Sequence, residues 1–360
     1  MKLFLKLSLI ALTVLSLSLA GCRPPELESA VMEFNKGRYE SAKEKAKVAT
    51  EKNPEVAEGW WIYGISSIET AKSLDDYSTG KHALDKAKEL DTKTYGKKAE
   101  DYQYSQYGNS YNLSVKYFNQ ASALTSGDSA NVVLDKVIEK AQIAAIFKPE
   151  KAAIYTLIAR SYLTMKNTDQ AGEYYQKAYE MGPDSLSIQF DLAYFLFSQK
   201  KDYKGAIIYF DKIVANPKDS EAANTFKNDS YQLLAACYDA LGEPEKIKEA
   251  YINALSINPD NDKINFNLGT IYFQEQNLAD AEKHFTSALD TGMDTPEVYL
   301  YLGNCRNVLH KYDEAREVLE MGVSKYPDNG EMWNQLGKAY AHLNLRKEAE
   351  AAFKKAKDSE

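Results

Sequence analysis

Residues 296–329 read PEVYLYLGNCRNVLHKYDEAREVLEMGVSKYPDN, and residues 330–360 repeat the pattern as GEMWNQLGKAYAHLNLRKEAEAAFKKAKDSE. An aromatic residue stands at the fourth position of both stretches, as Tyr299 and Trp333, and a leucine–glycine pair follows at the seventh and eighth. Similar spacing occupies the two stretches before them. Four consecutive units of 34 residues therefore begin, with no slip in register, at Asn228, Asp262, Pro296 and Gly330.

This spacing resembles the tetratricopeptide repeat, in which each unit is a pair of antiparallel helices. The resemblance implies an all-α fold, a right-handed superhelical solenoid of helix-turn-helix repeats with a long concave surface. A small residue at position 8 lets two helix backbones approach, while aromatics at positions 4, 11 and 24 fill the gaps. Pro259 and Pro327 end two of the second helices, since proline lacks the N–H and clashes with the preceding turn.

Upstream of these four units the pattern continues with insertions. Further units are expected, in chain order, at 23–56, from 57, at 101–149, at 152–185 and from about 187. The residues that we assign to the signature places of the unit at 101–149 are Tyr104, Tyr107, Gly108 and Tyr111. This unit has about 17 extra residues, which predicts a long hairpin with its turn at 125–128.

Two organisational expectations follow from these units. We expect N-terminal repeats with lengthened hairpins over 22–149 and a regular array over 150–360. The stretch between Pro217 and Asn228 is either a loop or an extra helical turn, and its Glu-Ala-Ala sequence favours the helix.

The first 21 residues are expected to be a lipoprotein signal peptide and not part of the fold. Lys2 and Lys6 precede a short apolar stretch at 7–19, which is too short for a membrane-spanning helix. Leu-Ala-Gly-Cys at 19–22 resembles a bacterial lipobox, which implies a lipid such as palmitate on Cys22. The alternative is an ordinary secretory signal with a chance cysteine. Arg23 replaces the aspartate of the inner-membrane retention signal, so the outer membrane facing the periplasm is expected.

Charge and cysteine content exclude several classes of function. The formal net charge is −8 and no basic patch dominates, which argues against nucleic acid as a partner. Cys237 and Cys305 both fall at position 10 of units two repeats apart, too far for a disulfide, so we expect small buried hydrophobes. No phosphate loop, zinc motif or nucleophile elbow occurs and the four histidines are scattered, so no catalytic residue, metal or cofactor is assigned.

The resemblance implies a groove lined by positions 2, 5, 9, 12 and 13 of the first helices. The residues that we assign to this partner-binding groove are Arg160, Phe195, Phe266, Phe273, Asn304, Asn307 and Lys338. Aromatics, amides and a few cations suit a protein or an extended peptide. The competing interpretation is that some of the aromatics form core between repeats. Phe266 and Thr270 replace the lysine and asparagine with which chaperone-binding members clamp a terminal carboxylate, so that activity is not implied.

A tyrosine-rich segment offers a second candidate surface. Tyr104, Tyr107 and Tyr111 have helical spacing and are expected in the core, whereas Tyr102 and Tyr117 lie off that stripe. The latter two either pack or contact a partner or a sugar ring.

The sequence thus favours a lipid-anchored scaffold in the cell envelope that binds other proteins through its groove and has no small-molecule substrate. Lipoproteins that resemble it serve outer-membrane assembly, pilus biogenesis or the recruitment of cell-wall enzymes. The alternative is a substrate-binding lipoprotein for glycans or peptides, since some glycan receptors of the outer membrane use these repeats. A hydrolase would require an activity that one point mutation abolishes.

Overall fold

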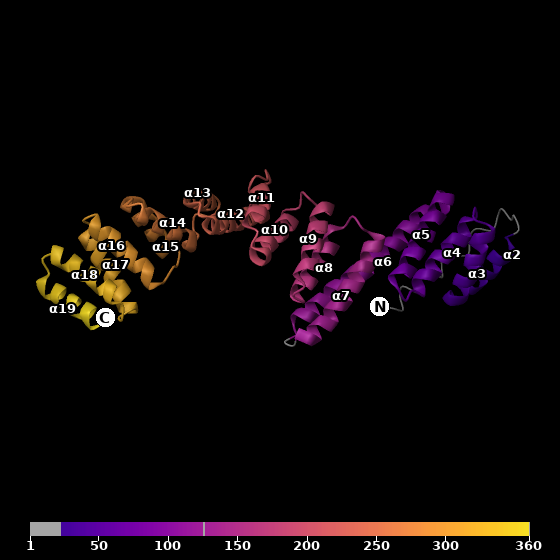
Figure 1. The fold of residues 1–360 in the computed structure, drawn as a ribbon, viewed down its shortest axis with the longest axis horizontal. Coiled ribbons are helices and arrows are strands. Elements are labelled where there is room, and N and C mark those ends of the chain that lie inside the picture. The colour runs from indigo at the N-terminus through magenta and orange to yellow at the C-terminus, as the bar shows by residue number, and fades with distance from the viewer. Residues whose placement is uncertain (1–22, 125–126, 360) are drawn as a thin grey trace. The chain divides into compact units, whose positions relative to one another are not determined.

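The computed structural model describes residues 23–124 and 127–359, so Cys22 and the expected signal peptide lie outside the described residues. All regular structure in the described part is helical, as eighteen α-helices and one π-helical turn, and this confirms the expected all-α fold (Figure 1). The chain forms two compact units, unit 1 ending at Met181 and unit 2 beginning at Gly182.

Unit 1 is a row of four helix pairs in which each helix packs against the next along the chain. Its helices are α2 (Pro25–Asn35), α3 (Tyr39–Lys52), α4 (Ala57–Glu69), α5 (Leu74–Leu90), α6 (Thr92–Ser122), α7 (Gly127–Phe147), α8 (Ala152–Thr164) and α9 (Thr168–Met181). The pair α6 and α7 is the long hairpin expected from the sequence, with 31 and 21 residues.

Unit 2 continues with five helix pairs. Its helices are α10 (Leu186–Phe195) with the π-turn η1 (Leu196–Lys200), α11 (Tyr203–Val214), α12 (Glu221–Leu241), α13 (Pro244–Ile257), α14 (Asp262–Gln274), α15 (Leu278–Asp290), α16 (Pro296–Val308), α17 (Tyr312–Lys325), α18 (Gly330–His342) and α19 (Arg346–Asp358). The stretch between Pro217 and Asn228 becomes helical from Glu221, as favoured, and Ser220 caps α12 by accepting a hydrogen bond from the Ala223 N–H.

Glycine is required at position 8 of some units because the two helices of a pair approach each other closely there. A Cβ added at Gly269 would lie 2.8 Å from the Phe285 ring, and one at Gly303 would lie 2.4 Å from the Leu319 side chain. Both neighbours are fully buried. The small residue therefore permits the interhelical packing that the repeat pattern predicts.

In five of the nine helix pairs that the structure describes, the residue at position 4 makes one recurring hydrogen bond. Its side chain donates to the carbonyl oxygen of a proline six residues earlier, which holds the incoming loop against the first turn of the helix. The pairs are Trp60–Pro54, Tyr155–Pro149, Gln189–Pro183, Asn265–Pro259 and Trp333–Pro327, at 2.5 to 2.9 Å. Gln189 at position 4 places the start of its unit at 186, one residue before the expected start.

The unit that contains α6 also begins earlier than expected, at 92 instead of 101. Ala99 is fully buried at the place of the small residue, and Tyr95 and Tyr102 contact the Trp61 ring with centroids 5.4 and 6.4 Å away. Tyr102 also donates to Glu69 Oε1 at 2.8 Å, so it packs within unit 1. The assignment of Tyr104 to the core was wrong, since 61% of its surface is exposed.

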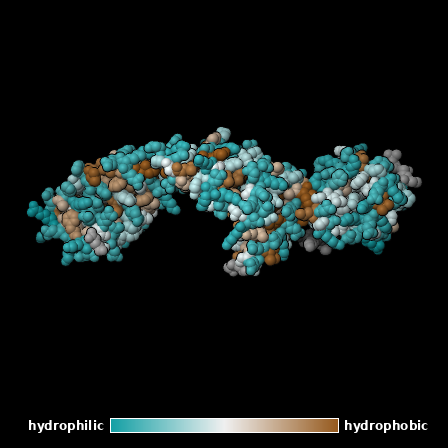
Figure 2. Space-filling model, viewed as in Figure 1, coloured by the Kyte–Doolittle hydropathy of each residue, from teal (hydrophilic) through white to brown (hydrophobic). Residues whose placement is uncertain are grey.

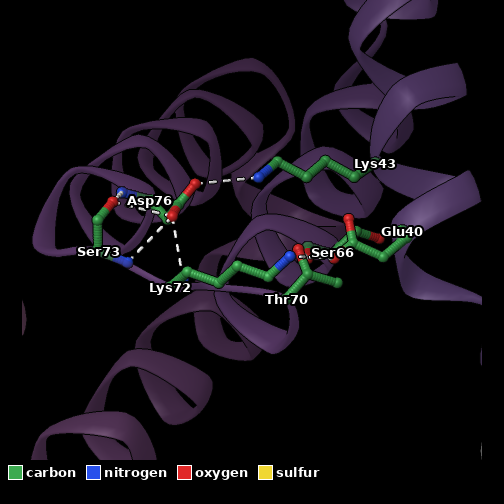
Figure 3. Close-up of polar contacts among 7 residues, drawn as sticks. All are labelled: Glu40, Lys43, Ser66, Thr70, Lys72, Ser73 and Asp76. Carbon is green, nitrogen blue, oxygen red and sulfur yellow. Dashed lines mark hydrogen bonds and ion pairs between the residues drawn. The ribbon is translucent and has the colours of Figure 1, made fainter.

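Polar contacts connect neighbouring helix pairs beside this apolar packing. In unit 1, Lys43 of α3 bonds Asp76 of α5 at 3.1 Å, and Asp76 also accepts from the Ser73 hydroxyl in the capping box of α5 (Figure 3). In unit 2, the nearly buried Glu282 accepts from Arg306 at 3.4 Å and from Lys311 at 2.7 Å. Such contacts join one repeat to the next.

The two described cysteines are free and buried, as the sequence predicts. Burial raises the pKa of Cys237 to about 11 and that of Cys305 to about 12. Across the described residues, no helix combines the length and apolar character that crossing a bilayer demands.

Candidate partner-binding surface

Helices α14, α16 and α18 present matching positions because each begins 34 residues after the previous one and each has 13 residues. Side chains at positions 5, 9 and 12 of these helices lie close to one line, since they are separated by about one helical turn. These positions on the first helices of unit 2 form one surface, which we name the first-helix surface.

Aromatic rings join α14 to α16 on the first-helix surface. Phe266 and Phe273, at positions 5 and 12 of α14, lie 6.0 and 5.5 Å from the Tyr301 ring of α16. All three side chains are half-buried at the edge of a core that also contains Phe285. They are therefore held in place by packing while part of each ring remains accessible, which is the state of an aromatic anchor for a partner.

Two polar side chains continue this surface onto the next helices. Asn304 of α16 is half-buried and Lys338 of α18 is exposed, and both occupy position 9. An amide donates and accepts hydrogen bonds, and an ammonium donates three. Asn304 and Lys338 thus supply polar contacts beside the aromatic rings of α14 and α16.

Asn307, in contrast, is used within the protein. Its side chain is only 9% exposed, and its Nδ2 donates to the main-chain oxygen of Gln335 at 2.9 Å. It joins two successive first helices and does not reach a partner in this arrangement.

Phe195 is also placed in the interior, with 3% of its surface exposed. With its unit starting at 186, Phe195 occupies position 10, the buried place held elsewhere by Cys237 and Cys305. The exposed position 9 belongs to Tyr194, which is 49% exposed and stacks on Phe190 with centroids 6.3 Å apart. Tyr194, which the sequence did not single out, is therefore the accessible residue at this place, and the bond from Gln189 to Pro183 fixes its position number.

Arg160 lies on α8 in unit 1, where it is exposed at position 9 of its own repeat. It belongs to a separate compact unit from the other assigned residues, so the structure does not bring the assigned set together as one cluster.

A shallow hollow at the last repeat was not predicted. Its volume is 300 Å³, and residues of α17, α18 and α19 line it, among them Trp333, Tyr340 and Lys355. Burial, followed by the hydrogen bond to Glu320 at 2.7 Å, raises the pKa of Tyr340 to about 12, so its hydroxyl stays protonated at neutral pH. Lys355 lies 4.1 Å from the centroid of the Trp333 ring, which leaves the hollow with apolar, hydroxyl and cationic groups.

The chemistry of these surfaces is that of binding. In the part of the chain that the structure describes, no group of three or more histidine, cysteine or carboxylate side chains is placed to hold a metal ion. The view in Figure 2 shows mainly hydrophilic surface with scattered apolar residues on both units. Aromatic edges among neutral and cationic polar groups suit an extended polypeptide whose backbone offers hydrogen bonds.

Comparison with known protein families identifies the repeats. Models described as tetratricopeptide repeat match residues 156–221, 296–339, and both 229–261 and 330–360. The matched segments include most of α8 to α13 and all of α16, α17 and α18.

Two curated relatives share part of the sequence. The type IV pilus assembly protein PilF of Pseudomonas aeruginosa is 26% identical over 203 residues, which are 55% of this chain and 72% of that protein. The anaphase-promoting complex subunit 3 of Schizosaccharomyces pombe is 32% identical over 128 residues, 35% of this chain. The chain matches only 18% of that subunit's length.

Among solved structures, PilF of Pseudomonas aeruginosa is similar with a TM-score of 0.45 and 16% identity, covering 64% of this chain and 96% of that one. YrrB, described as a tetratricopeptide-repeat protein with an unusual peptide-binding site, has a TM-score of 0.43 and 18% identity. It covers 54% of this chain and 96% of its own.

Proposed function

Because the chain carries tetratricopeptide repeats, we propose that it is a lipid-anchored scaffold that binds another protein of the cell envelope through its first-helix surface. Repeats of this class form binding surfaces and not catalytic sites, so the chain is not an enzyme. The proposed contact residues of this surface are Tyr194, Phe266, Phe273, Asn304 and Lys338. Arg160 is proposed as a separate contact on unit 1. The observation that carries the proposal is that three successive first helices carry accessible side chains at positions 5, 9 or 12: two aromatic rings on α14, an amide on α16 and a cation on α18.

The similarity to a pilus assembly protein supports a role in building an envelope structure. PilF shares 26% identity over more than half of this chain. We propose accordingly that the partner is a protein, or an extended segment of one, that takes part in envelope assembly.

The anchor is proposed from the sequence alone. Cys22 follows the small residues Ala20 and Gly21, as lipid attachment requires, and only Arg23 and Pro24 separate it from the start of α2 at Pro25. Growth with an alkyne-labelled palmitate tests this directly. The full-length chain should take up label and remain with the outer membrane, whereas Cys22→Ala should lose both. An unlabelled wild-type chain in the soluble periplasmic fraction would exclude the anchor.

The partner-binding surface is tested by capture from the native envelope followed by mass spectrometry. Lys338→Glu reverses an exposed charge on α18, and Lys354→Glu reverses an exposed charge on α19 of the same repeat, which makes it the matched control. The partner recovered with the wild type should be lost with Lys338→Glu and retained with Lys354→Glu. Equal recovery with both variants would place the binding surface elsewhere.

A tyrosine-to-alanine substitution tests the aromatic half of the same surface. Tyr194→Ala removes an exposed ring that stacks on Phe190 and leaves the core in place. Loss of an aromatic anchor at a binding surface costs about 2 kcal/mol, so recovery of the partner should fall about thirtyfold at limiting concentration.

A further inference from the structure

Helix α6 is far longer than a first helix of this fold needs to be. The first helices α4, α8, α14, α16 and α18 all have 13 residues, whereas α6 has 31. The register that begins at 92 places Tyr104 at position 13. Residues 105–122 are therefore additional turns, and with α7 they form the lengthened hairpin of unit 1 (Figure 1).

Three tyrosines form a continuous row where these additional turns begin. The ring of Tyr107 lies 5.8 Å from that of Tyr104 and 5.9 Å from that of Tyr111, and the latter pair is inclined by only 18°. Tyr107 and Tyr111 are half-buried against core residues of unit 1, while Tyr104 is the most exposed large hydrophobic residue of the described chain. The row is thus held by packing on one side and accessible on the other.

Gly108 opens a gap beside this row. It lies four residues after Tyr104 and therefore one turn along the same helix face. A Cβ built on it would meet no atom within 4 Å, in contrast to Gly269 and Gly303, which permit helix packing. A glycine inside a helix costs about 1 kcal/mol relative to alanine. At this position the glycine does not permit any helix packing that would offset this loss of stability. It leaves the helix backbone uncovered next to the tyrosine rings.

The segment that carries the row has no charge. Residues 102–115 contain no lysine, arginine, aspartate or glutamate, although 27% of the chain is charged, and Asp101 and Lys116 flank the segment. Its exposed polar side chains include the amides Asn109 and Asn112. Burial raises the pKa of Tyr107, so that hydroxyl also remains neutral. Neutral amides and hydroxyls donate and accept hydrogen bonds equally well.

We propose that Tyr104, Tyr107 and Tyr111, with the gap at Gly108, form a binding site for an uncharged oligosaccharide. The apolar faces of successive sugar rings lie on the tyrosine rings and over the bare backbone of Gly108, where a side chain would obstruct them. The hydroxyls of the sugar exchange hydrogen bonds with Asn112, which lies beside Gly108 on the helix surface, and with the tyrosine hydroxyls. The segment offers no cation and the Glu150 carboxylate lies near Tyr107, so acidic sugars gain no ion pair here and are disfavoured. This site lies on a different helix from every residue of the first-helix surface, so it adds a second ligand to the proposed scaffold.

Isothermal titration calorimetry with the full-length chain in detergent tests the site. The probes are cellohexaose, maltohexaose and hexa-N-acetylchitohexaose as neutral ligands, hexagalacturonate as an acidic one, and a decaproline peptide. At least one neutral hexasaccharide should bind with a Kd of about 1 mM or tighter, and more tightly than hexagalacturonate and decaproline. Tyr104→Ala should weaken that binding about tenfold.

Gly108→Gln separates binding from folding. Because the added side chain has open space around it and glycine is a poor helix former, the variant should melt at the wild-type temperature or above while binding about tenfold more weakly. Tyr194→Ala removes another exposed tyrosine, 49% accessible against 61% for Tyr104, from the protein-binding surface of unit 2. It is the control and should leave sugar binding unchanged. The proposal is overturned if no neutral hexasaccharide binds, if hexagalacturonate or decaproline binds more tightly, or if Gly108→Gln binds like the wild type.

Discussion

The side chain of Asn307 donates from Nδ2 to the main-chain oxygen of Gln335 at 2.9 Å, and so joins α16 to α18. From the sequence, Asn307 is expected to bind a partner peptide, because an amide side chain on a first helix can form hydrogen bonds with the main chain of a bound peptide. The structure shows that the amide already binds a backbone, that of the following repeat. Its role in this arrangement is cohesion between repeats.

Replacing Asn307 by alanine should therefore lower stability. The Gln335 carbonyl would keep its bond within α18 but lose the one from α16, and the net loss of one such hydrogen bond costs about 1 kcal/mol. Urea unfolding followed by circular dichroism measures this. Asn304→Ala, which removes the half-buried amide one turn earlier, should change the free energy of unfolding by less than about 0.5 kcal/mol. Similar losses in the two variants would contradict the assigned role.

Glycine-to-alanine substitutions at Gly303 and Gly108 should have opposite effects on stability. In Gly303→Ala the new methyl group would lie 2.4 Å from the buried Leu319 side chain, so the helices must separate, at a cost of about 1 to 3 kcal/mol. In Gly108→Ala the methyl group meets nothing within 4 Å, and the better helix propensity should add about 0.5 to 1 kcal/mol. Thermal and urea unfolding of the two variants side by side provide the comparison.

Stability should fall in acid partly through Asp76. Hydrogen bonds from the Lys72 main-chain N–H, from Lys43 and from Ser73 hold the pKa of this carboxyl well below its usual value. A carboxyl group whose pKa is lower in the folded state than in the unfolded state stabilises the fold at pH values above its unfolded-state pKa. This stabilisation is lost as the pH falls toward the folded-state pKa. Between about pH 5 and about pH 2, the wild type should lose more stability than Asp76→Asn. Parallel pH profiles of the two proteins would rule out this role.

Cys237 and Cys305 should resist alkylation while the protein is folded. Their thiols are buried and their pKa values are raised to about 11 and about 12, so almost no reactive thiolate exists near about pH 8. In a Cys22→Ala background these are the only two cysteines. Iodoacetamide labelling read by mass spectrometry should show no adduct on the native chain and two after unfolding in urea. Labelling at the native stage would mean that α12 or α16 opens locally.

The sequence was sufficient to predict the paired helices of unit 2. Glycines such as Gly269 and Gly303 mark the positions at which the two helices of a pair can pack closely, and so indicate how the helices align. The sequence was insufficient where such a glycine is missing. Tyr194 and Phe195 are adjacent, and aromatic spacing alone does not decide which of them faces inward. The bond from Gln189 to Pro183 decides it, but a glutamine at position 4 is not an aromatic signature.

Helix α6 shows the same limit in unit 1. Its 31 residues contain tyrosines at several helical spacings, so the row that begins at Tyr104 resembled the signature at least as well as Tyr95 and Tyr102. The deciding contacts are with Trp61 on α4, a neighbour about forty residues earlier that the local pattern does not reveal. For the same reason Gly108 resembled a packing glycine although its surroundings are open.

Within each unit a helix packs mainly against its immediate predecessor and successor in the chain. The stability of such an array is approximately a sum of contributions from each pair and from its contact with the next pair. Opening can therefore begin at a terminal pair such as α18 and α19 and spread pair by pair, while the pairs behind it stay closed.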